Sequence, residues 1–237
     1  MIETRELTYQ IDGISFHGFY AFDNTISHKR PGILIAHDWT GLTDFTRNKA
    51  KKLAELGYVG FALDMYGEGK TGASKEEKMQ LMQPLVNDRH LLFNRMQGAM
   101  NALQNLDIVN SSALGVIGFC FGGLCALDLA RSSSEIKGVV SFHGGLTSPP
   151  SAKLQHIMSK ILVLHGYEDP LVPKEQIPAF EAEMTEKNAD WQIHIYGNAM
   201  HSFTNPDAND KSFGTVYNAL ADKRSWLAMK NFFNEVF

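Results

Sequence analysis

The sequence contains little cysteine, with only Cys120 and Cys125 among its 237 residues. These two thiols lie five positions apart across an expected strand-to-helix turn, which makes them poor partners for a disulfide bond. They are also too few, and too close in the chain, to form a structural zinc site. Such sparse thiols fit a reducing compartment, so we expect a cytoplasmic protein.

Long apolar runs and clusters of basic residues are also absent. No apolar segment approaches the roughly 20 residues that a membrane helix requires. The N-terminal MIETRELTYQ carries acidic residues and lacks the apolar stretch of a signal peptide. Lysine and arginine are scattered and the formal net charge is -4, which gives no indication of nucleic-acid binding. We therefore expect neither a membrane nor a nucleic acid as a partner, while the oligomeric state stays open.

What remains is an ordinary globular composition, 44% hydrophobic and 20% charged. The length fits one α/β domain, which we expect to span residues 1–237. Segments 3–10 and 14–22 predict a hairpin that turns at Asp12-Gly13. We see no internal repeat and no linker-like segment.

Strands alternate with helices from residue 32 onward. Helical patterns lie between short apolar runs, and the last helix is expected over 216–235. The alternation predicts an α/β fold with a mostly parallel sheet and helices on both faces. Functional residues should then collect at the carboxyl ends of the strands. The expected strands are 32–37, 58–64, 113–119, 136–144, 160–166 and 191–197.

One strand-to-helix turn, Gly118-Phe119-Cys120-Phe121-Gly122-Gly123, has the pattern of a nucleophile elbow with sulfur in place of oxygen. Gly118 and Gly122 lack a Cβ, so strand and helix can approach closely around the turn. Cys120 then stands at a helix N-terminus, where the helix dipole favours a thiolate. The Phe121 N–H is placed to receive an oxyanion. The alternative is a buried, inert Cys120, the role that we expect for Cys125.

A thiol nucleophile needs a base, and the base needs a group that orients it. Cys120, Asp169 and His201 each follow a predicted strand, in the nucleophile–acid–histidine order of α/β-hydrolases. Taken singly, Asp169 could instead cap the helix that follows, and His201 could be an ordinary loop residue. Three suitable residues at three strand ends in this order predict a catalytic triad.

Other chemistries fit the sequence less well. His37, His143, His165 and His201 all fall near strand ends, but they lack the close spacing of metal ligands. The glycines of 118–123 do not match a dinucleotide fingerprint, and no phosphate loop is present. We therefore predict no metal and no cofactor.

Four motifs carry a resemblance to a known family: Gly118–Gly123, LDMYGEG at 63–69, HGYEDPLVP at 165–173 and YGNAMHSF at 196–203. With these motifs the chain resembles the dienelactone hydrolases, a cysteine branch of the α/β-hydrolase superfamily. The resemblance covers nearly the whole length and implies an α/β-hydrolase fold. It also implies hydrolysis of esters or lactones through a thioester acyl-enzyme formed on Cys120, with Asp169 as acid and His201 as base.

The same resemblance implies two further roles after the first buried strand. The family places a carboxylate there in contact with the resting thiol, usually Glu, and this sequence offers Asp38. The backbone N–H of Trp39 would be the second oxyanion donor.

The expected substrate differs from that of the family. Dienelactone hydrolases bind a substrate carboxylate with arginines, one of them in a His-Ser-Phe-x-Arg pattern where this chain has Asn205. Loss of a bidentate arginine is not a conservative change. We therefore predict small neutral or activated esters, aryl esters included, with neutral phosphotriesters as side substrates. Asn205 and the aromatic residues Trp39, Tyr66, Phe121 and Phe203 are candidates for the substrate pocket, although plain core packing is an equal alternative for each ring.

A different class of function stays open. The chain could be a hydrolase-fold binding protein whose Cys120 senses redox state without turnover. The presence of both Asp169 and His201 favours the enzyme, because a binding protein has no need of a triad.

Overall fold

The computed structural model describes residues 1–132, 135–149 and 156–237. The chain divides into two compact units, Met1–Ile117 and Gly118–Phe237. The expectation of one domain over the whole chain stays a prediction.

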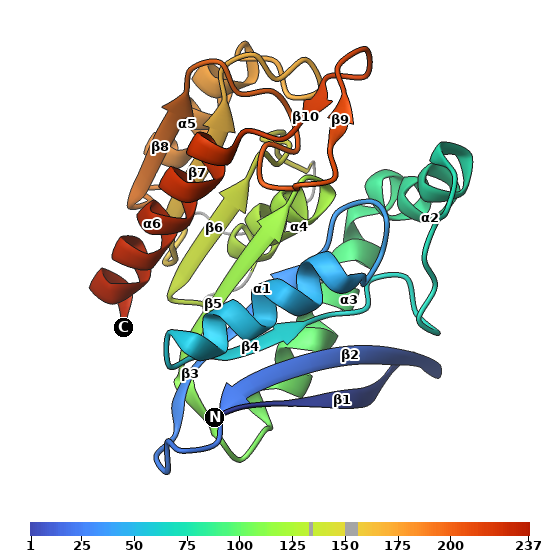
Figure 1. The fold of residues 1–237 in the computed structure, drawn as a ribbon. Helices are drawn as coiled ribbons and strands as arrows, with labels where there is room; N and C mark the ends of the chain where they lie inside the picture. Colours follow the sequence, from blue (N-terminus) through green and yellow to red (C-terminus); the bar gives the residue numbers. More distant parts are fainter. Residues whose placement is uncertain (133–134, 150–155) are drawn as a thin grey trace. The chain divides into compact units, whose positions relative to one another are not determined.

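The first unit opens with the predicted hairpin, drawn in blue in Figure 1. Strand β1 (Ile2–Ile11) pairs antiparallel with β2 (Ile14–Asp23), and Ile11 stands opposite Ile14. The two turn residues have positive φ, 50° at Asp12 and 78° at Gly13, as a two-residue hairpin turn requires. Strand β2 then pairs antiparallel with β4 (Val59–Ala62), which runs parallel to β3 (Arg30–Ala36).

Each helix of the first unit has a capping signal at one of its ends. Helix α1 (Asp44–Glu55) is followed by Gly57 at φ 89°. A capping box between Ser74 and Glu77 starts α2 (Lys75–Asn87). The Asp88 carboxylate accepts two backbone N–H bonds at the start of α3 (Arg89–Gln104).

Two of these helices cover opposite faces of the sheet. The Cβ position of Gly60 points at Ala50 of α1, and that of Gly32 points at Leu103 of α3. Gly60 pairs with Ile33, and successive residues of a strand point to opposite faces. Gly32 and Gly60 therefore face opposite sides, and the strands between them are buried on both.

The second unit contains the end of β5 (Val109–Phe119) and a parallel run of strands. Val140 pairs with Leu162, and Leu162 pairs with Gln192. Gly138 faces Phe232 and Phe233 of the last helix, whereas Ser141, three residues on, faces Gly123. Helices therefore cover both faces here too. The other elements are α4 (Phe121–Ala130), β6 (Gly138–Phe142), β7 (Lys160–Gly166), α5 (Gln176–Glu186), β8 (Trp191–Tyr196) and α6 (Ala219–Val236).

The hydrogen-bonded order of the main sheet is β1-β2-β4-β3-β5-β6-β7-β8. A mostly parallel sheet with helices on both faces confirms the expected α/β fold, and the order is that of an α/β-hydrolase sheet. The sequence did not predict a small ribbon of β9 (Asn209–Asp210) and β10 (Thr215–Val216). Two residues per strand are too short for an alternating pattern.

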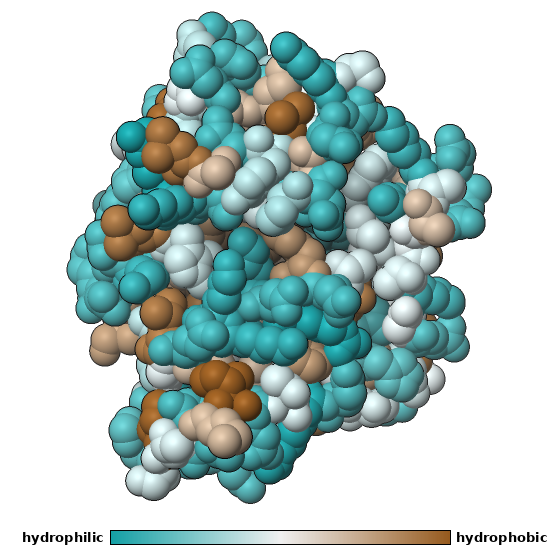
Figure 2. Space-filling model, in the orientation of Figure 1, coloured by the Kyte–Doolittle hydropathy of each residue, from teal (hydrophilic) through white to brown (hydrophobic). Residues whose placement is uncertain are grey.

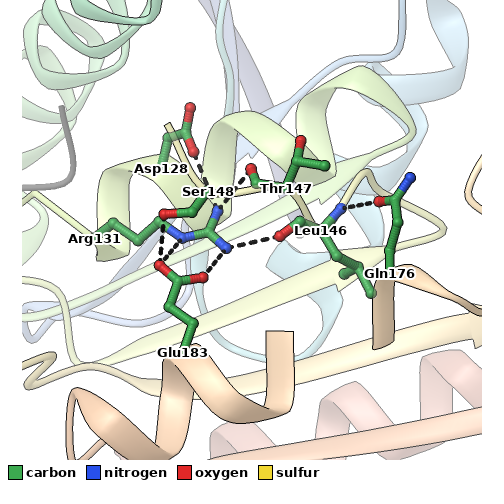
Figure 3. Close-up of polar contacts among 7 residues, drawn as sticks. All are labelled: Asp128, Arg131, Leu146, Thr147, Ser148, Gln176 and Glu183. Carbon is green, nitrogen blue, oxygen red and sulfur yellow. Dashed lines mark hydrogen bonds and ion pairs between the residues drawn. The ribbon is translucent and has the colours of Figure 1, made fainter. Parts of the chain in front are cut away.

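A buried ion cluster in the second unit surrounds Arg131, whose side chain is fully buried (Figure 3). The guanidinium donates to both Glu183 oxygens, at 3.0 and 2.7 Å, and to Oδ1 of Asp128 at 3.2 Å. It also donates to the backbone carbonyl of Leu146 at 2.8 Å. Arg131 thereby links the end of α4, the segment after β6 and helix α5.

The surface in Figure 2 is largely hydrophilic, and hydrophobic residues appear on it as small separate patches. The exposed large hydrophobic residues include Leu220 and Leu227 of α6. Within the described ranges, no helix combines the length and the apolar character needed to cross a membrane.

Candidate active site

Cys120 occupies a strained turn between β5 and α4, with φ 55° and ψ -118°. A Cβ at Gly118 would lie 1.9 Å from the carbonyl oxygen of Gly122, so only glycine fits there. One at Gly123 would lie 2.8 Å from Cα of Gly144. These close approaches let the strand end directly against the helix, and the first of them supports the expected role of Gly118. Positive φ at a non-glycine residue is a form of strain that collects at functional sites.

The backbone of Cys120 is held on both sides. Its N–H donates to the carbonyl of Phe142 at 3.0 Å and to Nδ1 of His143 at 3.1 Å. Its carbonyl accepts from Gly123 N–H at 2.9 Å, at the start of α4. Cys120 is partly exposed whereas Cys125 is buried. Of the two thiols, Cys120 is thus the one open to a reagent.

Asp169 and His201 meet in the second unit. Nδ1 of His201 lies 2.7 Å from Oδ2 of Asp169, and both residues are buried. The other carboxylate oxygen, Oδ1, accepts from the N–H groups of Leu171 and Val172 at 2.8 and 2.9 Å. Asp169 therefore contacts the imidazole with one oxygen and closes its own turn with the other, but it does not cap helix α5, whose N-cap is Glu175. Its role as the catalytic acid stays a prediction.

The ribbon β9–β10 holds the backbone of His201. The His201 N–H donates to Gly214 at 3.0 Å, and its carbonyl accepts from Val216 N–H at 3.0 Å. The residue also forms an isolated bridge with Thr215. The missed ribbon is therefore the support of the predicted base.

Electrostatics join His201 to Cys120. Burial lowers the pKa of His201, but the charge of a Cys120 thiolate and the hydrogen bond to Asp169 outweigh it and raise the pKa to about 10. Within the described residues, Nε2 of His201 is buried and makes no hydrogen bond of normal geometry. The Cys120 charge and the Asp169 hydrogen bond therefore favour an imidazolium at His201.

Two of the histidines weighed as metal ligands, His37 and His165, lie in the protein interior. Within the described ranges, no group of three or more His, Cys, Asp or Glu side chains could hold a metal ion. His165 is buried, and burial lowers its pKa, which favours the neutral ring. His37 is also buried, and its Nε2 accepts from Met65 N–H at 3.1 Å. Both act as interior side chains.

The predicted residues of the first unit lie in the loops after β3 and β4. Oδ1 of Asp38 accepts from Thr40 N–H at 2.8 Å, and the Tyr66 hydroxyl donates to the carbonyl of Trp39 at 2.8 Å. These three predicted residues are thus grouped within one unit. The thiol contact of Asp38, the oxyanion role of Trp39 and the pocket role of Tyr66 stay predictions.

Two more predicted pocket residues follow His201. Phe203 is fully buried, and its ring meets that of His143 edge-on at 5.0 Å. Oδ1 of Asn205 accepts from Asp207 N–H at 3.0 Å and therefore closes its own turn. The part that Phe203, Asn205 and Phe121 take in a substrate pocket stays a prediction.

The family model for the dienelactone hydrolase family matches residues 16–237. The chain belongs to the dienelactone hydrolase family. It is similar to a solved dienelactone hydrolase-like promiscuous phosphotriesterase from metagenomic libraries, with 36% identity and a TM-score of 0.96 over 100% of this chain and 99% of that one.

Curated relatives match as well. An uncharacterised protein of Caenorhabditis elegans is 42% identical over 157 residues, which cover 65% of this chain and 99% of that protein. A putative carboxymethylenebutenolidase of Yersinia pestis is 23% identical over 260 residues, covering 98% of this chain and 94% of the relative. The family resemblance expected from the motifs is confirmed, and the protein is a hydrolase of this family.

Proposed function

We propose that this dienelactone hydrolase family member cleaves small neutral or activated carboxylic esters and lactones with a Cys120–His201–Asp169 triad. The observation that carries the proposal is the 2.7 Å contact between His201 and Asp169, in a site where the Cys120 charge favours the imidazolium. A nucleophile, a base and an orienting acid are the minimum set for thiol acyl transfer.

Acylation begins with the Cys120 thiolate. Sulfur attacks the ester carbonyl carbon, a C–S bond forms, and the carbonyl π electrons move to oxygen. The Phe121 N–H, at the first position of α4, donates to that oxyanion. The C–O bond then breaks, and the His201 imidazolium gives its proton to the departing alkoxide or phenolate.

Deacylation uses the same residues in reverse. Neutral His201 takes a proton from water while the water oxygen attacks the thioester carbon. The C–S bond breaks, the acid leaves, and the thiolate and imidazolium are restored. Asp169 keeps the imidazole in the orientation that both half-reactions need.

Asn205 supports a neutral substrate. It stands where the family pattern has an arginine, and an amide whose oxygen is used by Asp207 N–H provides no charge for a carboxylate. An anionic substrate would have to leave water without a bidentate partner. Neutral phosphotriesters, like neutral carboxylic esters, carry no anionic group. A solved structure 36% identical to this chain is that of a dienelactone hydrolase-like promiscuous phosphotriesterase. We include them as side substrates.

A comparison of wild type with Cys120→Ala on p-nitrophenyl acetate tests the proposal. Wild type should turn over the ester and Cys120→Ala should lose turnover, while circular dichroism of the two stays the same. Mass spectrometry of the quenched wild type should find an acyl group on Cys120. Cys125→Ala is the matched control and should keep activity. Alkylation of Cys120 without ester turnover would instead support the redox-sensing or binding alternative.

A further inference from the structure

His143 is a buried residue with an unusual backbone, directly after β6. It is 2% exposed and has φ 42°, in the left-handed region that costs a non-glycine residue free energy. Such a conformation persists only where the surrounding contacts impose it. Its N–H donates to the carbonyl of Leu164 at 2.8 Å, which anchors the residue to the neighbouring strand β7.

The hydrogen bonds of the ring define its protonation. Nδ1 lies 3.1 Å from the Cys120 nitrogen, and a backbone N–H can only donate, so Nδ1 must accept. The ring proton therefore sits on Nε2, which donates to Oγ1 of Thr204 at 2.8 Å. In this arrangement His143 is a neutral Nε2–H tautomer and supplies no charge to the site.

Thr204 lies three residues after His201, on the same loop as the proposed base. The His143 ring also meets the His201 ring edge-on, with 5.1 Å between centroids. One side of His143 thus holds the backbone of the proposed nucleophile, and the other holds the loop of the proposed base. Cys120 and His201 are far apart in the chain, and these contacts connect their segments through a single side chain.

We propose that His143 is a positioning residue that sets the separation of the Cys120 sulfur from the His201 imidazole. The inference rests on the proposed function, because it assigns to His143 the alignment of that nucleophile and that base. Proton transfer is steeply sensitive to geometry, so a small displacement of either segment should slow the chemistry. Substrate binding should change little, because His143 is buried and bonded on both sides.

Substitutions can separate the two hydrogen bonds. His143→Phe keeps an aromatic ring but removes both bonds. His143→Asn keeps an acceptor close to the place of Nδ1, and His143→Gln keeps a donor close to the place of Nε2. Thr204→Val removes the hydroxyl that receives the Nε2 proton at almost unchanged volume.

We expect His143→Phe to lower kcat for p-nitrophenyl acetate by about ten- to a hundredfold, with KM within about threefold. The rate of Cys120 alkylation by iodoacetamide should change its pH profile in the same variant. Thr204→Val should lower kcat less. The double variant should be no slower than His143→Phe alone, because both residues act through one contact. His143→Asn should have a higher kcat than His143→Phe, because its side chain can still accept from the Cys120 N–H.

Ser159→Ala is the matched control, because it removes another buried hydroxyl bond of the second unit, to the carbonyl of Ile136 at 2.7 Å. It should lower stability and leave kcat unchanged. The inference is overturned if folded His143→Phe keeps a kcat within about twofold of wild type. It is also overturned if kcat falls no further in His143→Phe than in Ser159→Ala when the two variants are equally stable. If His143→Phe does not fold, an unchanged kcat in Thr204→Val overturns it. Turnover that survives Cys120→Ala would refute the proposed function itself, and the two failures are therefore distinguishable.

Discussion

Nδ1 of His201 contacts Oδ2 of Asp169 at 2.7 Å, while Oδ1 of the same carboxylate accepts from two backbone N–H groups. The backbone N–H groups therefore hold the carboxylate in place independently of its contact with the imidazole. When His201 is neutral, this fixed acceptor favours the tautomer with its proton on Nδ1, which leaves Nε2 for the proposed nucleophile. This arrangement determines what each substitution at the site should do.

Loss of the base should cost more rate than a change of the acid. His201→Ala removes the proposed base, which would transfer protons in both half-reactions. In Asp169→Asn the amide keeps an oxygen for Leu171 and Val172 N–H but turns an NH2 group toward His201, which favours the wrong tautomer. We expect kcat losses of about 10²–10⁴ for Asp169→Asn and a larger loss for His201→Ala.

Steady-state rates of both variants on one ester, with folding checked by circular dichroism, measure this order. Thr185→Val removes a hydroxyl on α5 that donates to the Glu181 carbonyl at 2.7 Å, and this control should keep full activity. The opposite order of losses would mean that another carboxylate performs the role given to Asp169.

Stability should fall at alkaline pH because of His201. Its pKa is raised to about 10 in the folded protein, since the Cys120 charge and the Asp169 hydrogen bond outweigh burial. Between the unfolded value of about 6.5 and about 10, the folded state holds a proton that the unfolded state has lost. This contribution is fully present below about 6.5 and is lost as pH rises through the folded pKa.

Urea unfolding of wild type and His201→Asn at several pH values between 6 and 10.5 tests this linkage. The stability advantage of wild type should shrink progressively over that range. An advantage that does not change with pH would contradict the imidazolium assignment. Cys120→Ala should show a smaller pH-dependent part, because it removes one cause of the shift.

The charge of the substrate should determine kcat/KM. We expect a higher kcat/KM for p-nitrophenyl acetate than for an anionic dienelactone, because residue 205 has no cation. Asn205→Arg should raise kcat/KM for the anionic substrate relative to the neutral one, and Asn205→Lys should do so less, because an ammonium cannot form a bidentate pair. A strong wild-type preference for the dienelactone would contradict the argument from Asn205.

Loss of the buried Arg131 cation should destabilise the protein more than loss of one partner of an exposed ion pair. Arg131→Met leaves Asp128 and Glu183 without their cation, which costs about 3–5 kcal/mol for a buried pair. Thermal unfolding should show the loss, and Arg131→Met combined with Glu183→Gln should recover part of it. Lys160→Met breaks the exposed pair with Glu235, at 2.9 Å, and should change stability little. An equal effect of both substitutions would contradict this account.

Much of the fold was predictable from the sequence, because its signals are local. The runs at 32–37 and 160–166 read as buried strands, and the turn at Asp12-Gly13 required positive φ at both positions. Each of these signals acts within a few residues of the chain, and a pattern of apolar and polar residues records it directly.

The sequence by itself determined the residue types of the candidate triad, their chain order and the glycines that the Cys120 turn requires. Only the tertiary structure decided that His143 joins Cys120 to Thr204, that β9–β10 holds His201, and that Arg131 is buried among three segments. These contacts pair residues that are distant in the chain, and the local sequence around one partner does not indicate which residue the other will be. Burial makes each such pairing necessary, because a polar group removed from water needs a partner, and folding alone decides which partner is within reach.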